Sequence, residues 1–176
     1  APDSALFRGI RGPAELPERN VKIPIEDLRA LSIALLKRAG MGQEDAQVVT
    51  DAVVEAELRG RPAHGAIRLP GIAERVSARG RTAMRVVRRV GHSTLVDGNG
   101  NLGYLVAHRC ARTVAESARA GGIGLVGACN TDSCGMAGHY ASRVVDSGLI
   151  CLVACNTGPR VAPWGGSEAV LGANAL

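Results

Sequence analysis

The chain has 176 residues, 46% of them hydrophobic and 21% charged, so it is long enough to bury a core and has the composition of a soluble globular protein. No apolar run reaches the roughly 18–20 residues of a membrane span, and residues 1–21 lack the apolar core of a secretory signal, so we expect a flexible N-terminal extension and a cytoplasmic protein with no membrane partner. A net charge of +5 with only four aromatic side chains leaves little to stack on bases, which argues against nucleic acid as a partner.

Three helices are predicted in the first half of the chain, over residues 25–39, 43–59 and 64–78. Leucines recur at helical spacing in the first, which stops at Gly40, and small apolar residues form one stripe of the second. The third carries polar residues on its outer face. The sequence therefore predicts a small helical layer.

His64 and Arg68 are four residues apart at the start of the third predicted helix, which would place both side chains on one face. An arginine fork can hold a carboxylate, and a histidine beside it can transfer a proton. Alternatively, His64 only caps the helix. A small anionic substrate is the partner that the first interpretation implies.

Arginines are concentrated around this pair, with nine between Arg59 and Arg89 against one acid, Glu74. Such a stripe is either a solvated surface or an attraction for an anionic substrate or cofactor phosphate. The pattern alone leaves both interpretations open.

The middle of the chain predicts a strand pair over 86–90 and 94–96, a turn at 97–100 and a long helix over 102–120. Two similar apolar runs follow, 124–131 and 150–157, each ending in Cys-Asn-Thr, with a helix predicted over 136–147 between them. This arrangement predicts a βαβ unit with parallel strands. The two Asn-Thr pairs would then share a site at the carboxyl ends of the strands, unless they only form turns. The five cysteines are expected to be reduced thiols.

Several motifs resemble those of the malate/L-lactate dehydrogenase-like family. Residues 63–70 are similar to its Ser-His-Gly-x-x-Arg-Leu-Pro signature, with Ala63 in place of serine. Further similar segments are 95–103, 122–126, 137–141, 162–166 and 171–174. The resemblance covers residues 22–176 and implies an α/β fold, with an N-terminal helical bundle and a mixed sheet carrying a βαβ unit.

The resemblance also implies an NAD(P)H-dependent oxidoreductase acting on a 2-oxo acid, a 2-hydroxy acid or a cyclic imino acid. In that interpretation Arg68 holds the substrate carboxylate and His64 transfers the proton. The residues that would line the nicotinamide are Asn130, Pro163, Trp164, Gly165, Gly166 and Asn174.

The segment 130–135 departs from the family pattern Asn-Ser-Asn-His-Phe-Gly. Ser133 replaces its histidine, Asp132 an asparagine and Cys134 a phenylalanine, and the following helix has His139 in place of an aromatic residue. Ile72 also replaces a tyrosine. Asp132, Ser133, Cys134 and His139 include nucleophile and base types. They favour either a changed reaction, such as a hydrolase or transferase, or simple packing in an altered site.

Family members are roughly twice as long as this chain, so the resemblance implies that residues 22–176 match only an N-terminal half. We therefore expect a second polypeptide, or another copy of the chain, to complete the fold, and a homo-oligomer. The alternatives to a redox enzyme are one subunit of a split or processed enzyme and a non-catalytic binding subunit.

Overall fold

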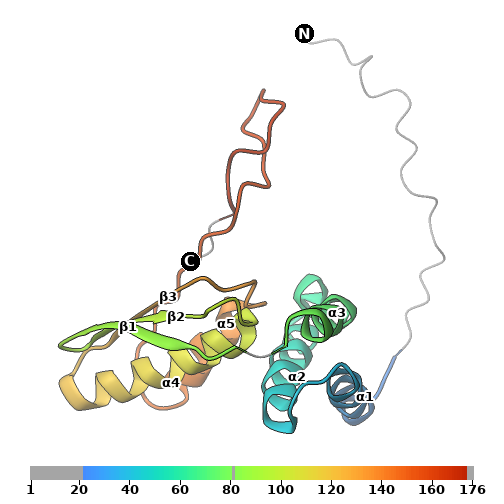
Figure 1. Ribbon diagram of the computed structural model, residues 1–176, viewed down its shortest axis with the longest axis horizontal. Helices are drawn as coiled ribbons and strands as arrows, with labels where there is room; N and C mark the ends of the chain where they lie inside the picture. The colour runs from blue at the N-terminus through green and yellow to red at the C-terminus, as the bar shows by residue number, and fades with distance from the viewer. Residues whose placement is uncertain (1–21, 81, 174–176) are drawn as a thin grey trace.

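The computed structural model describes residues 22–80 and 82–173, and the extension predicted for residues 1–21 lies outside this range. Three helices, α1 (Ile25–Arg38), α2 (Gln43–Leu58) and α3 (Leu69–Arg79), form one layer. Beside it lie a three-stranded sheet and the helices α4 (Gly103–Gly121) and α5 (Ala137–Val145) (Figure 1). The α/β fold class expected from the sequence is confirmed.

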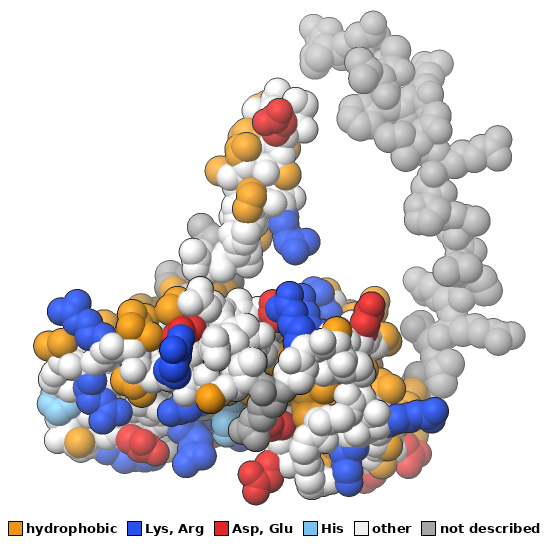
Figure 2. Space-filling model, in the orientation of Figure 1, with side chains coloured by type: hydrophobic (Ala, Val, Ile, Leu, Met, Phe, Trp, Pro, Cys, Tyr) orange, Lys and Arg blue, Asp and Glu red, His pale blue; other side chains and the backbone are white. Residues whose placement is uncertain are grey.

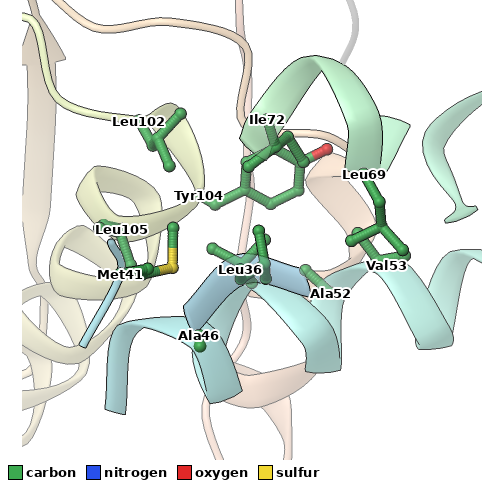
Figure 3. Close-up of a cluster of buried hydrophobic side chains, with 11 residues drawn as sticks. Leu36, Met41, Ala46, Ala52, Val53, Leu69, Ile72, Leu102, Tyr104 and Leu105 are labelled. Atoms are coloured by element: carbon green, nitrogen blue, oxygen red, sulfur yellow. The ribbon is translucent and has the colours of Figure 1, made fainter. Parts of the chain in front are cut away.

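The main core lies where the helical layer meets the start of α4. Of the leucines predicted to form a stripe on α1, Leu36 is fully buried between α1 and α2, whereas Leu31 is 60% exposed. The predicted small-residue stripe of α2 is buried. Tyr104 lies among these side chains, close to Ile72 (Figure 3). The cluster consists of Leu36, Met41, Ala46, Val49, Ala52, Val53, Leu69, Ile72, Leu102, Tyr104 and Leu105.

The third helix begins five residues later than predicted. Two 3₁₀ turns, Pro62–His64 and Ala66–Arg68, precede α3, with Gly65 (ψ −145°) between them. Pro70 stands in the first turn of α3, where a proline needs no amide partner and favours a helix start. The expectation that His64 and Arg68 share one face of an α-helix is therefore wrong.

The sheet has the order β1-β2-β3, with strands β1 (Arg85–Val90), β2 (Ser93–Asp97) and β3 (Leu125–Cys129). β1 and β2 pair antiparallel, as predicted, and β2 pairs with β3 in parallel. The βαβ unit is thus β2-α4-β3, which begins two elements earlier in the chain, one strand and one helix, than expected.

The run 150–157 was predicted to be the second strand of that unit, and this prediction is wrong for the described residues. No strand forms there, and Leu152 is 81% exposed. An isolated apolar run acquires strand structure only when a neighbouring strand accepts its backbone hydrogen bonds. The pattern of apolar residues shows that a segment could be buried, but it does not show whether a partner strand is present.

One face of the sheet is covered and the other is not. Alternation along β2 buries Thr94 and Val96, on the side where α4 packs, and exposes Leu95, which is joined on β3 by the exposed Leu125. Figure 2 shows hydrophobic side chains gathered on this part of the surface and along the segment that follows it.

Residues 155–173 form an arm that projects from the body of the molecule (Figure 1). Val161 and Leu171 bridge its two sides in antiparallel fashion, and Trp164 near its tip is fully exposed. Among the residues described, no helix is both long enough and apolar enough to span a membrane.

Candidate functional site

The loop 130–135 is held at the carboxyl ends of the two parallel strands. The Gly100 amide donates to the Asn130 carbonyl at 2.8 Å, and the Asn130 side-chain amide donates to Asp97 Oδ1 at 3.1 Å. The first Asn-Thr pair therefore lies where open α/β sheets place their ligands, as predicted.

Asp97 organises the turn that faces this loop. The Asn99 amide, the Asn130 side chain and Arg85 all donate hydrogen bonds to its carboxylate, and together they hold the pKa of Asp97 below its ordinary value. The sequence predicted a turn at 97–100 but not this role for its first residue. An acid followed by Gly-Asn-Gly was the signal available.

The far side of the loop packs against the start of α4, and glycines permit the contact. A Cβ on Gly103 would overlap the backbone of Asp132 and Ser133. A Cβ on Gly135, which has a φ of +78°, would lie 2.7 Å from Cε1 of Tyr104. The loop is therefore fixed between two strand ends and one helix start.

Three side chains of the loop were candidates for chemistry, and the structure gives each a local environment. Asp132 forms an ion pair with Arg75 at 2.5 Å and lies 3.9 Å from Arg79. The Ser133 hydroxyl accepts a hydrogen bond from the Gly135 amide at 3.4 Å. Burial raises the pKa of the Cys134 thiol, and nearby Cys155 raises it further, which disfavours the thiolate.

His139 does not contact the loop side chains but anchors α5 to α2. It is 1% exposed, and its Nδ1 lies 2.5 Å from Glu55 Oε2. The Arg143 Nε–H donates to its Nε2 at 3.1 Å, so Nε2 is an acceptor and the ring is neutral with its proton on Nδ1. Burial lowers the pKa of His139. Because both ring nitrogens are engaged, a Ser133–His139 or Cys134–His139 dyad does not form.

Arg68 is tied by a hydrogen bond to the backbone just before His64, and no helical face is shared by the two residues. The Arg68 Nε–H donates to the carbonyl of Ala63, the residue before His64, at 2.6 Å. This bond uses the Nε side of the guanidinium and leaves its two Nη groups without a partner among the residues described. His64 Nδ1 is buried and has no hydrogen-bond partner within residues 22–80 and 82–173.

Glu57, in the last turn of α2, holds this segment in place. Its Oε1 accepts a hydrogen bond from the Ala66 amide at 2.6 Å, and a Cβ on Gly65 would overlap the same carboxylate. Gly65 is therefore explained by packing against Glu57. Sequence analysis missed Glu57 because its spacing on α2 is that of an ordinary solvated acid.

Four of the eight arginines that the structure describes in this stretch form ion pairs within the chain. Arg59 binds Glu55 and Ser142, Arg85 binds Asp97, and Arg75 and Arg79 face Asp132. Among the residues that the structure describes, Arg68 bonds through its Nε alone, to the residue before His64. The stripe therefore combines internal ion pairs with exposed arginines such as Arg88 and Arg89.

The remaining cofactor candidates are not gathered at the loop. Pro163, Trp164, Gly165 and Gly166 lie on the exposed arm, where the Gly166 amide donates to the Pro163 carbonyl to close a tight turn. Asn174 lies outside the described residues. In the second Asn-Thr pair, the Thr157 hydroxyl accepts a hydrogen bond from the Ala173 amide. All five cysteines are free, as expected.

Comparison with known proteins places this arrangement in a family. A family model described as malate/L-lactate dehydrogenase matches residues 23–176. The chain belongs to the malate/L-lactate dehydrogenase family. Malate dehydrogenase of Pyrococcus horikoshii is 34% identical over 162 residues, which are 90% of this chain and 45% of the relative. The solved structure of that enzyme superposes with a TM-score of 0.83, over 88% of this chain and 45% of the other.

Two further relatives are dehydrogenases of other acids. L-sulfolactate dehydrogenase of Methanothermobacter thermautotrophicus is 33% identical over 90% of this chain and 45% of its own length. Ureidoglycolate dehydrogenase (NAD(+)) of Escherichia coli K12 is 28% identical over 89% of this chain and 46% of its own length. The chain thus spans about half the length of the relatives that it matches.

Proposed function

We propose that this chain is part of an NAD(P)H-dependent oxidoreductase that acts on a 2-oxo acid, a 2-hydroxy acid or a cyclic imino acid. The observation that carries the proposal is the unused hydrogen-bonding capacity of Arg68 and His64. Among the residues that the structure describes, the Arg68 Nη groups and the buried Nδ1 of His64 have no hydrogen-bond partner. A carboxylic acid with a carbonyl or imine at the next carbon has the two groups that such a pair recognises.

Arg68 binds the substrate carboxylate in this proposal. Its Nε–H bond to Ala63 fixes the plane of the guanidinium, so the two Nη groups can donate in parallel to the two carboxylate oxygens. His64 then moves the proton at the neighbouring oxygen or nitrogen of the substrate. Glu57 keeps the two residues in register by holding the backbone between them.

The residues that would hold the nicotinamide cofactor are Asn130 in the loop and Pro163, Trp164, Gly165, Gly166 and Asn174 towards the end of the chain. The described members fit that role, since Gly165 (φ +76°) and Gly166 form a turn that leaves the Trp164 indole free for stacking on a planar group. When bound, the cofactor supplies or accepts a hydride. The relative named for NAD(+) supports a nicotinamide cofactor.

We further propose that residues 22–176 act as the N-terminal half of a domain that a second polypeptide completes, within a homo-oligomer. The free edge of β3, the uncovered face at Leu95 and Leu125, and the exposed run at Ile150 and Leu152 support this proposal. Parallel strands are normally covered on both faces, and edges normally have partners.

The hydrolase or transferase alternative has no support from the geometry of the loop. Its candidate base, His139, is committed to Glu55 and Arg143, and the Cys134 pKa is raised. A non-catalytic binding subunit is the outcome that remains if the chain binds acids without turnover.

The Arg68→Lys variant tests the proposal, with Arg88→Lys on the exposed β1 strand as the matched control. Loss of the guanidinium fork should weaken binding of the cognate acid by about tenfold or more, while cofactor affinity and unfolding temperature stay unchanged. Calorimetric titration of both variants with L-malate and pyruvate measures this. Unaltered affinity in Arg68→Lys would show that the arginine does not hold the substrate.

A further inference from the structure

We propose that the Tyr104 hydroxyl is an additional substrate-binding group, which donates a hydrogen bond to the acid held by Arg68. This inference rests on the proposed function and extends it to a residue outside the motifs that suggested that function. Tyr104 stands in the first turn of α4, where the helical layer, the 62–68 segment and the loop 130–135 converge.

The position of the phenol is fixed on two sides. Its ring packs in the core beside Leu69 and Ile72 (Figure 3). Its hydroxyl borders Gly135, because a Cβ on that glycine would lie 3.0 Å from the oxygen. The Arg68 guanidinium is also near enough to act on the pKa of the phenol. The hydroxyl therefore borders the loop and lies within electrostatic reach of the arginine.

The hydroxyl has no hydrogen-bond partner among the described residues, although the residue is only 4% exposed. A buried tyrosine normally finds an acceptor for its O–H. Tyr140 does so, donating to the Cys134 carbonyl at 2.7 Å. A ligand oxygen is the acceptor that Tyr104 lacks.

The protonation state suits a donor. Burial raises the pKa of Tyr104, so the phenol keeps its proton at neutral pH. In this proposal an oxygen of the acid held by Arg68 accepts the hydrogen bond from the phenol. The site should favour acids over their amides, because a carboxylate makes charge-assisted hydrogen bonds to Arg68 that a neutral amide lacks.

The chain contains two tyrosines, which makes a direct test possible. The full chain labelled with 3-fluorotyrosine should give two fluorine resonances, assigned through the variants Tyr104→Phe and Tyr140→Phe. L-lactate, pyruvate and L-malate are titrated in the presence of NADH or NAD⁺, with L-lactamide as the neutral control. We expect the Tyr104 resonance to shift with at least one acid and not with the amide, while the Tyr140 resonance stays in place.

Affinity and stability measurements complete the test. Tyr104→Phe removes only a hydroxyl that has no partner within residues 22–80 and 82–173, so its unfolding temperature should match that of the wild type while acid affinity falls about tenfold. Tyr140→Phe loses a buried hydrogen bond and should be the less stable of the two. Equal acid affinity in Tyr104→Phe and wild type, or an unmoved Tyr104 resonance, would overturn the inference.

The failure of this inference is distinguishable from failure of the proposed function. If cofactor and acid both bind but Tyr104 does not respond, only the role of the tyrosine is wrong. If cofactor binds and no acid does, acid recognition by Arg68 and Tyr104 is wrong. If neither binds, the proposed function itself fails, and the inference with it.

Discussion

The packed region at the carboxyl ends of β2 and β3 differs from the exposed region formed by the edge of β3 and residues 150–173. At the carboxyl ends of β2 and β3, two loops, a helix start and the helical layer satisfy one another's backbone and side-chain groups. At the outer edge of β3 and in residues 150–173, apolar side chains of similar type are exposed. Both regions match the same family model, so the difference reflects the packing partners that each region finds and not its sequence character.

The largest expected effect is a difference in stability between core and exposed substitutions, one in each region. Leu36→Ala empties a fully buried site and should lower the free energy of unfolding by about 2–5 kcal/mol. Leu152→Ala, at an exposed position, should change it by less than about 0.5 kcal/mol in the chain alone. Chemical denaturation of both variants measures this. A comparable loss in Leu152→Ala would mean that the 150–157 run is already packed.

This contrast also explains what the sequence could predict. The leucine stripe of α1, the small-residue stripe of α2 and the β1–β2 pair were predicted because local periodicity and turn residues determine them. The strand at 150–157 was wrongly predicted because an edge strand depends on a partner that no local pattern encodes. The four-residue spacing of His64 and Arg68 suggested an earlier start for α3. Gly65 and Pro70 place the start at Leu69 instead.

Part of the candidate site was within reach of sequence reasoning. The loop 130–135 was placed correctly at a strand end. The joint role of His64 and Arg68 stays a prediction, because the only bond between their segments in the described part of the chain is from Arg68 to the Ala63 carbonyl and the two residues share no helical face. Tyr104 and Glu57 were missed because their roles arise from contacts across elements. His139 was grouped with the loop because of its residue type. Its contact with Glu55 on α2 joins positions far apart in the sequence, so no local pattern predicts it.

The tight contact in the packed region can be tested at Gly135. Gly135→Ala places a methyl group against the Tyr104 ring at a positive φ, and should cost about 1–3 kcal/mol of stability. Gly138→Ala is the control, because a Cβ there meets nothing within 4 Å and α5 continues through it. Thermal unfolding compares the two variants. Equal melting temperatures would show that the loop does not press on Tyr104.

A smaller effect should appear in the pH dependence of stability. The pKa of His139 is lowered in the fold, so the unfolded chain takes up its proton first as the pH falls. Stability contributed by the neutral ring is therefore present above its ordinary pKa of about 6.5 and is lost below it, by at most about 1.4 kcal/mol per pH unit.

The variant His139→Asn isolates this term, because His108, whose pKa is also lowered, remains in both proteins. Urea unfolding between pH 7.5 and about 5 should show a steeper loss of stability in the wild type than in the variant. Parallel pH profiles would exclude a neutral, buried His139.

The smallest effect on stability is expected for the ion pair of Asp132 in the loop 130–135. Asp132→Asn removes the charge that pairs with Arg75, a partly exposed arginine, and should cost about 0.5 kcal/mol, less at high salt. A double-mutant cycle with Arg75→Gln measures the coupling. A coupling above about 2 kcal/mol would show that the pair is effectively buried and fixes the loop.

The most direct test of the account is titration calorimetry of the protein purified from its source, together with any polypeptide that accompanies it, against NADH and NADPH. The account predicts saturable heat with at least one cofactor and a rise in unfolding temperature as that cofactor is added. No heat and no protection from unfolding with either cofactor at millimolar concentration would contradict the assignment of this chain to a nicotinamide-dependent dehydrogenase activity.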